Sequence, residues 1–115
     1  MSSPALGPET DTGPLIGSAS VLTFGSVTTV VASGEFDAGT CAGLAEALEL
    51  ACAKETDVVV DLSGVTFLDG AALRRIEVAA GKVSGEGRSL RLANPPRVVV
   101  RLIHAAGAVD MLHSG

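Results

Sequence analysis

The sequence predicts a single α/β domain with a mixed four-stranded sheet and three to four helices, in the order ββαβαβα. Three consecutive valines open an apolar run over residues 58–68, which is typical of a strand buried on both faces by helices. Around it, β-rich runs alternate with stretches in which apolar residues recur every three or four positions. A chain of 115 residues is long enough for one modest core.

Composition divides the chain into two parts. Residues 1–17 are rich in Gly, Pro, Ser, Thr and acids, so we expect a flexible N-terminal tail followed by one folded domain over residues 18–115. Neither a signal-peptide pattern nor an apolar stretch of about 18 residues is present, and we expect a cytoplasmic protein. Cys41 and Cys52 would lie roughly 16 Å apart on one helix, beyond disulfide reach, and are expected to be buried thiols.

The charge is unevenly distributed along the chain. The net charge is −5, which disfavours nucleic acid as the main partner. Nine acids and one base give residues 1–68 a charge of −8, whereas four acids and seven bases give residues 69–115 a charge of +3. Solvated helix faces and a basic face for an acidic protein partner both explain this asymmetry.

The first half of the folded region is expected to form a hairpin, a helix and a return strand. Residues 19–24 and 27–31 are rich in β-formers and are separated by Gly25-Ser26, which favours a tight turn with positive φ at glycine. Asp37 is expected to cap a helix whose apolar stripe comprises Cys41, Leu44, Ala45, Leu48 and Cys52. The strands on either side of that helix should be parallel.

The second half is expected to continue as helix, strand, helix. Ser63-Gly64 should turn the chain after the valine strand, and Asp69 should cap a helix that begins at Gly70 and buries Leu73, Ile76, Ala80 and Val83. Residues 89–93 alternate as a short strand. Asn94 is expected to cap a last helix with the apolar stripe Val99, Leu102, Ile103 and Ala106, before a final turn over residues 109–112.

Catalytic patterns are not evident in the sequence. It contains neither a phosphate-binding GxxxxGK[ST] loop nor a GxSxG elbow. His104 and His113 have no nucleophile nearby in sequence. A carboxylate pair could be formed only by Asp61 at a strand end and Asp69 at a helix cap, and a cap has a structural role of its own. We therefore expect a protein that is not an enzyme and that uses no cofactor or metal.

Three segments together resemble a known family, the STAS domain of bacterial anti-sigma factor antagonists. They are residues 34–37 (GEFD) after a strand, residues 60–69 (VDLSGVTFLD) before a helix, and residues 90–95 (LRLANP) before another helix. The likeness extends over residues 18–112. It implies a module that binds an anti-sigma factor, usually a serine kinase, and so influences sigma-factor-dependent transcription. In the family, phosphorylation of a serine at the start of the helix breaks the complex.

The sequence departs from the family at that serine. The family pattern is Asp-Ser-Ser-Gly or Asp-Thr-Ser-Gly, with the second hydroxyl residue as acceptor, whereas this chain has Asp69-Gly70-Ala71-Ala72. A methyl group cannot accept a phosphoryl group, so we expect no phosphorylation at Ala71. Ser63 and Thr66 are weaker substitutes, because loop hydroxyls more often form local turn bonds.

The resemblance and the loop positions predict a partner-binding surface at the ends of two adjacent parallel strands, comprising Gly34, Glu35, Asp37, Asp69, Gly70, Ala71, Ala72 and Arg74. Two alternatives remain open. STAS-like subunits also dock on the ATPase of bacterial ABC lipid transporters, and helix N-termini after Asp37, Asp69 and Asn94 would be anion sites in a nucleotide or small-ligand sensor. The acids at Asp37 and Asp69 would repel such an anion. We expect no nucleic-acid partner and no membrane insertion, and the pattern does not fix the oligomeric state.

Overall fold

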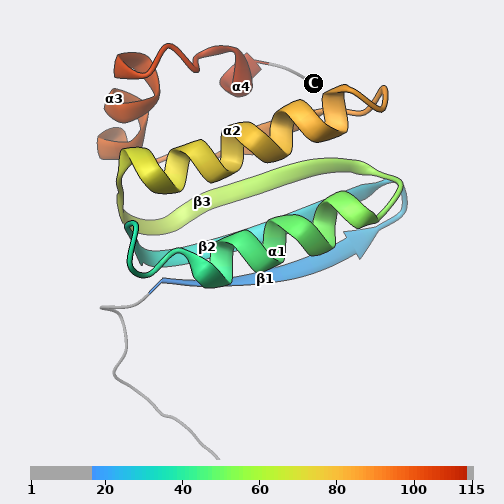
Figure 1. The fold of residues 1–115 in the computed structure, drawn as a ribbon, viewed down its shortest axis with the longest axis horizontal. Helices are drawn as coiled ribbons and strands as arrows, with labels where there is room; N and C mark the ends of the chain where they lie inside the picture. Colours follow the sequence, from blue (N-terminus) through green and yellow to red (C-terminus); the bar gives the residue numbers. More distant parts are fainter. Residues whose placement is uncertain (1–16, 114–115) are drawn as a thin grey trace, which may run out of the picture.

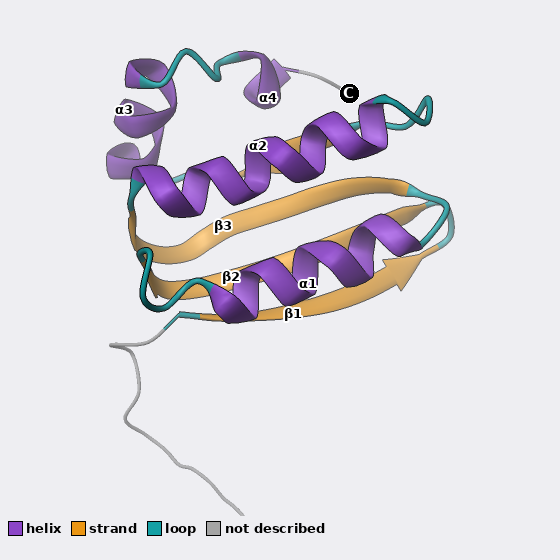
Figure 2. Cartoon of the chain, in the orientation of Figure 1, coloured by secondary structure: helices purple, strands orange, loops and turns teal. Residues whose placement is uncertain are grey.

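The structure, a computed structural model, describes residues 17–113. Its elements follow the predicted order ββαβαβα, with a short helix added at the end: β1 (Ser18–Phe24), β2 (Val27–Phe36), α1 (Ala42–Ala53), β3 (Asp57–Leu68), α2 (Gly70–Ser84), β4 (Leu90–Ala93), α3 (Arg97–Ala105) and α4 (Asp110–His113) (Figures 1 and 2). The predicted α/β fold class is confirmed. The flexible tail expected over residues 1–17 lies, except for Gly17, outside the described residues.

The four strands form one mixed sheet in the order β1-β2-β3-β4. β1 and β2 are antiparallel, as expected for a hairpin, and β3 and β4 each add in parallel. Gly25 in the hairpin turn has φ 59°, the left-handed conformation that glycine adopts without steric cost. Among the described strands, β1 lies at one side of the sheet and β4 at the other.

The core lies between the sheet and the helices α1 and α2, which lie side by side over one face (Figure 1). On that face the strands bury alternate apolar residues, including Val30, Val58, Val60, Leu62, Leu90 and Leu92. The residues between them point to the other face, and Thr29, Val31, Val59 and Asp61 are only half-buried. The expectation that helices bury the valine strand on both faces is therefore wrong.

β3 is one uninterrupted strand of 12 residues, so the turn expected at Ser63-Gly64 is also wrong. The glycine instead allows a close approach of β2, since a Cβ at Gly64 would lie 2.8 Å from the Cβ of Ser33. The pairing of β2 with β3 shifts register between Val31 and Ser33 and again between Gly34 and Glu35. A bulge of this kind bends the strand that carries the extra residue and increases the local twist.

Two of the three predicted helix caps are wrong. α1 begins at Ala42 and its N-cap residue is Cys41, so Asp37 lies too far upstream to cap it. α3 begins at Arg97 after Pro96, which offers no side-chain cap. Asn94 has φ 54°, and it turns the chain in the left-handed conformation that asparagine tolerates.

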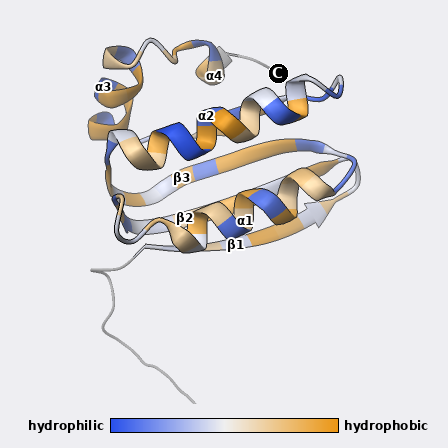
Figure 3. Ribbon diagram, viewed as in Figure 1, coloured by the Kyte–Doolittle hydropathy of each residue, from blue (hydrophilic) through white to orange (hydrophobic). Residues whose placement is uncertain are grey.

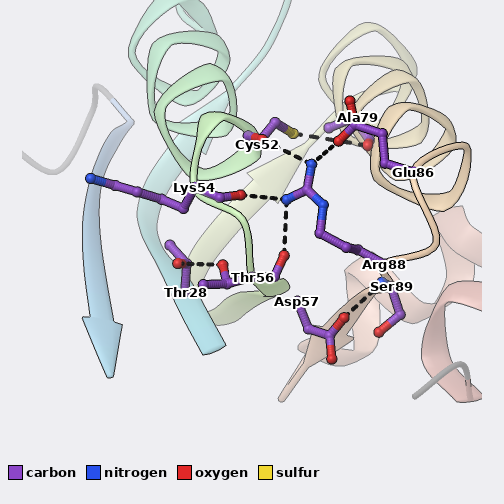
Figure 4. A network of polar contacts seen from close by, with 9 residues as sticks. All are labelled: Thr28, Cys52, Lys54, Thr56, Asp57, Ala79, Glu86, Arg88 and Ser89. Carbon is purple, nitrogen blue, oxygen red and sulfur yellow. Dashed lines mark hydrogen bonds and ion pairs between the residues drawn. The ribbon is translucent and has the colours of Figure 1, made fainter. Parts of the chain in front are cut away.

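Arg88 joins the end of α1 to the start of β4 (Figure 4). Its guanidinium donates to the carbonyl oxygens of Cys52 at 3.0 Å, Thr56 at 2.9 Å and Lys54, and it forms an ion pair with Glu86. The carbonyl groups at the end of a helix lack partners within the helix, and Arg88 supplies donors for this end of α1. The Arg88 side chain is only 14% exposed.

The cysteines are free and buried, which confirms the expectation for both. Burial raises the pKa of Cys52 above the usual thiol value, against weaker opposing effects of Lys82 and Arg88. Its thiol therefore stays protonated at neutral pH. Within residues 17–113 no helix combines the length and the apolar character that crossing a bilayer requires.

Candidate functional site

The ends of β2 and β3 lie next to each other. Phe36 and Leu68, the last residues of the two strands, are partners in the parallel ladder. The N–H of Asp69 donates to the carbonyl oxygen of Phe36 at 3.1 Å. The turns that follow the two strands therefore share one end of the sheet, as the sequence predicted. We call the candidate residues at this end the Asp69 surface. It comprises Gly34, Glu35, Asp37, Asp69, Gly70, Ala71 and Arg74.

Asp69 caps α2, which confirms its predicted role. Its backbone is extended, and its Oδ1 accepts from the N–H of Ala72 at 2.9 Å. The carboxylate thus serves one of the free N–H groups at the helix start. It is half-buried and engaged in the cap, so it is not a free catalytic base.

Asp37 closes a turn of its own. Its Oδ1 accepts from the N–H of Gly39 at 2.8 Å and from the hydroxyl of Thr40 at 3.0 Å. Its N–H donates back to Thr40 Oγ1 at 3.0 Å. These reciprocal bonds are typical of an Asx turn, and they hold the connection between β2 and α1 in one shape.

The first turn of α2 exposes Gly70, Ala71 and Arg74, but Ala72 is fully buried. Ala72 therefore belongs to the core, and its predicted place on a partner-binding surface is wrong. The helical period explains this, because Ala72 shares the buried face with Leu73 and Ile76.

On the β2 side, Glu35 is exposed and Gly34 is half-buried with φ 92°. A side chain at Gly34 would be strained in this left-handed conformation. The glycine therefore sets the bend that brings Glu35 and Asp37 to the end of the sheet.

The substitute hydroxyls lie on β3 rather than in a loop. Ser63 and Thr66 are both exposed. The N–H of Ser63 donates to Asp61 Oδ1 at 3.0 Å, and this bond lowers the pKa of Asp61 below its ordinary value, with further contributions from the side chains of Ser63 and Asn94. Hydroxyls at both positions are accessible from solvent.

Phe67 also lies at this end of the sheet, where it pairs with Glu35 of β2. It is not among the candidate site residues that the sequence predicted. Its side chain is 43% exposed, although it stands in the run that we expected to be buried. Its neighbour Leu68 is buried. Because successive side chains of a strand point to opposite faces, this alternation is the only sequence feature that predicts an outward Phe67. Exposed aromatic side chains are enriched in protein contact surfaces.

The described residues contain no group of three or more His, Cys, Asp or Glu side chains that could hold a metal ion. His104 is exposed on α3. Asp61 and Asp69 take part in separate hydrogen bonds, Asp61 with the N–H of Ser63 within β3 and Asp69 with the N–H of Ala72 at the start of α2. The Asp69 surface carries three carboxylates, on Glu35, Asp37 and Asp69, and one guanidinium, on Arg74. The small residues Gly34, Gly70 and Ala71 lie among them in sequence.

A family model described as Mlab, STAS domain, matches residues 21–113 of the chain. No protein with a curated description matches it. Among solved structures, the chain is similar to an anti-sigma factor antagonist from Mycobacterium paratuberculosis, with 25% identity and a TM-score of 0.78 over 88% of this chain and 86% of that one.

Two further structures share the fold at lower identity. The anti-sigma factor antagonist SpoIIAA in its unphosphorylated form is 11% identical, with a TM-score of 0.72 over 83% of this chain and 85% of that one. An antisigma-factor antagonist STAS domain from Rhodobacter sphaeroides is 15% identical, with a TM-score of 0.51 over 75% of this chain and 98% of that one.

Proposed function

The chain belongs to the STAS-domain family whose model is described as Mlab, STAS domain, and from this membership we propose that it is a regulatory protein-binding module of the anti-sigma factor antagonist type. Its partner is an anti-sigma factor of the serine-kinase class, which it sequesters to influence sigma-factor-dependent transcription. Similarity to an anti-sigma factor antagonist over most of both chains supports this proposal.

The position of Ala71 carries the proposal. Ala71 is exposed in the first turn of α2, two residues after Asp69, whose N–H bonds to the end of β2. A phosphate there would add a charge of about −2 and three acceptor oxygens to a surface where a partner docks. Because Ala71 has no hydroxyl, no phosphate charge is added at the start of α2, and the module remains competent to bind.

The test is capture of the partner by the full chain followed by affinity measurement. Tagged protein is used to purify partners from the native cytosol, and the binding constant of the recovered anti-sigma factor is measured with the wild-type chain, A71D and A71S. We expect A71D to bind at least about tenfold more weakly and A71S to bind like the wild type. The matched charge control is S20D, an exposed position on β1, which should bind normally.

Kinase treatment distinguishes a module that is never phosphorylated at this surface from one that is phosphorylated at another residue. With the captured kinase and ATP, the wild-type chain should take up no phosphate, whereas A71S should take it up on the introduced hydroxyl and then release its partner. Stoichiometric phosphate on any wild-type residue between 63 and 72 would overturn the proposal that this surface is not phosphorylated. The variants S63A and T66A would then identify the acceptor.

A second candidate function is an accessory subunit docked on the ATPase of a bacterial ABC lipid transporter. The absence of a hydroxyl at Ala71 favours it as well, because a permanently docked subunit needs no phosphate switch. Recovery of an ATPase and a permease, in place of a kinase, from tagged cells would select this function. The same A71D comparison then reports whether the Asp69 surface forms that contact.

A further inference from the structure

A groove runs between α1 and α2 on the outside of the helix layer. Its volume is about 220 Å³, and its floor is formed by small and apolar side chains, Ala45, Leu48 and Cys52 from α1 and Val78 and Ala79 from α2. Val78 is 62% exposed. An apolar residue this exposed in the lining of a groove leaves much of its surface in contact with water.

Charged side chains line both rims of this groove. Glu49 stands on the α1 rim, and Arg75 and Lys82 stand on the α2 rim. All three are exposed, and none takes part in an ion pair with another residue of the described chain. The rim of α2 therefore presents two positive charges that are available to an outside partner.

The spacing on α2 places these groups in one line. Arg75, Val78 and Lys82 stand three and four positions apart, so they share one face of the helix. The two cations are separated by about 10 Å along the axis, with Val78 between them. Figure 3 shows hydrophilic and hydrophobic bands alternating along α2.

The dimensions favour side chains of a protein over a small ligand. Pockets that enclose drug-sized molecules have volumes of about 300–1,000 Å³, and this groove is smaller and bounded by two parallel helices. Its volume leaves room for one or two inserted side chains of a partner helix.

We propose that this groove binds one helix of the protein partner, with an apolar residue inserted beside Val78 and acidic residues seven positions apart facing Arg75 and Lys82. The inference rests on the proposed function, because it assigns a second contact to the same partner. Charge complementarity to the α2 rim selects an acidic face on the bound helix: this rim has the pattern cation, apolar residue, cation, and its complement is acid, apolar residue, acid at the same spacing. The side of the bound helix that meets Glu49 on the α1 rim must not be acidic.

The groove and the Asp69 surface are related through one face of α2. Ala71 lies one helical turn before Arg75 on the exposed side of α2. A negative charge at Ala71 would therefore meet the end of the same acidic helix. One face of α2 then explains both contacts, with the small residue at its start and the two cations further along.

The test uses a defined helical probe, so that it does not depend on recovery of the natural partner. The probe is a stapled peptide of about 15 residues with Glu at two positions seven apart and Leu midway between them. The full ¹⁵N-labelled chain is titrated with it by NMR. We expect chemical-shift changes confined to residues 45–52 and 75–82 and binding that weakens as salt is added.

Charge reversal supplies the controls. R75E/K82E should bind the Glu probe at least about tenfold more weakly and should gain affinity for a matched probe with Lys in place of Glu. The control R91E/R97E changes the net charge equally at exposed sites outside the groove and should bind the Glu probe as the wild type does. V78D, at an exposed position, should abolish binding without loss of folded signals.

No shift at millimolar probe, equal binding of the Glu and Lys probes, or shifts outside the groove would each overturn the inference. Its failure is distinct from failure of the proposed function. If the probe does not bind but A71D still loses the captured partner, only the groove contact is wrong. If the probe binds but A71D keeps the partner, the groove stands and the Asp69 surface is not the docking site.

Discussion

Asp69 and Phe36 are joined by a backbone hydrogen bond of 3.1 Å between the N–H of the first and the carbonyl oxygen of the second. This bond fixes the turn after β3 against the end of β2 without using either side chain. The Asp69 carboxylate is consequently left to cap α2. Substitution of that side chain should therefore change the stability of the helix start while the two strand ends keep their register.

Removal of the Asp69 cap should destabilise the domain modestly. We expect D69A to lower the free energy of unfolding by about 1 kcal/mol, the usual value of an N-cap, because the N–H of Ala72 loses its acceptor. D69N keeps an acceptor oxygen and should lose only a few tenths of that amount. Urea denaturation followed by circular dichroism measures both, and equal losses in the two variants would contradict the capping role.

Removal of the Arg88 side chain should lower the free energy of unfolding by more than removal of the Asp69 cap. We expect R88A to lower the free energy of unfolding by about 2–3 kcal/mol, because hydrogen bonds from a charged donor are among the stronger ones in proteins. Amide exchange should speed up in the last turn of α1, whose carbonyl groups lose their donors. The exposed Arg91 is the control, and R91A should stay within about 0.5 kcal/mol of the wild type. Comparable losses in R88A and R91A would argue against the network in Figure 4.

Two glycines should respond oppositely to alanine. A Cβ at Gly64 would meet the Cβ of Ser33 at 2.8 Å and the carbonyl oxygen of Ala32 at 3.3 Å, so we expect G64A to cost about 1–3 kcal/mol. At Gly70 a Cβ meets nothing within 4 Å, and G70A should be neutral or stabilising by less than about 1 kcal/mol. Thermal unfolding of the two variants tests this, and a stable G64A would show that β2 does not approach β3 so closely.

The pKa of Asp61 predicts a pH dependence. The N–H of Ser63 lowers the pKa of this carboxyl in the folded state, so the ionised form stabilises the fold. Its contribution is complete at pH values above the unfolded-state pKa of about 3.9 and is lost as the pH falls through that value towards the lower folded-state pKa. The stability difference between wild type and D61N should shrink over this acidic range. A difference that stays constant from neutral pH downwards would contradict the hydrogen bond.

The features that the sequence predicted correctly are determined by residues close to one another in the chain. The hairpin follows from Gly25-Ser26 between two β-rich runs, and the start of α2 follows from Asp69 before a periodic apolar stretch. Parallel pairing of β2 and β3 follows from the helix between them. Placement of the two turns at one end of the sheet needs only that topology.

The features that were missed depend on residues far apart in the chain. Arg88 bonds to carbonyl groups more than 30 positions upstream, and nothing around it in sequence marks it. Gly64 resembles a turn residue, but its role comes from the close approach of Ser33. Asp37 and Asn94 are residue types that cap helices, yet one closes an Asx turn and the other adopts φ 54°.

The position of β1 at the side of the sheet has a practical consequence. Its seven residues, SASVLTF, include no charged residue and no proline. Charged residues and prolines on edge strands usually prevent pairing with a strand of another molecule. Phe24 is 87% exposed at its end. Among the described strands β1 is at the edge, so we expect a second molecule to pair with it and concentrated or warmed samples to aggregate first there. L22K should keep the protein in solution.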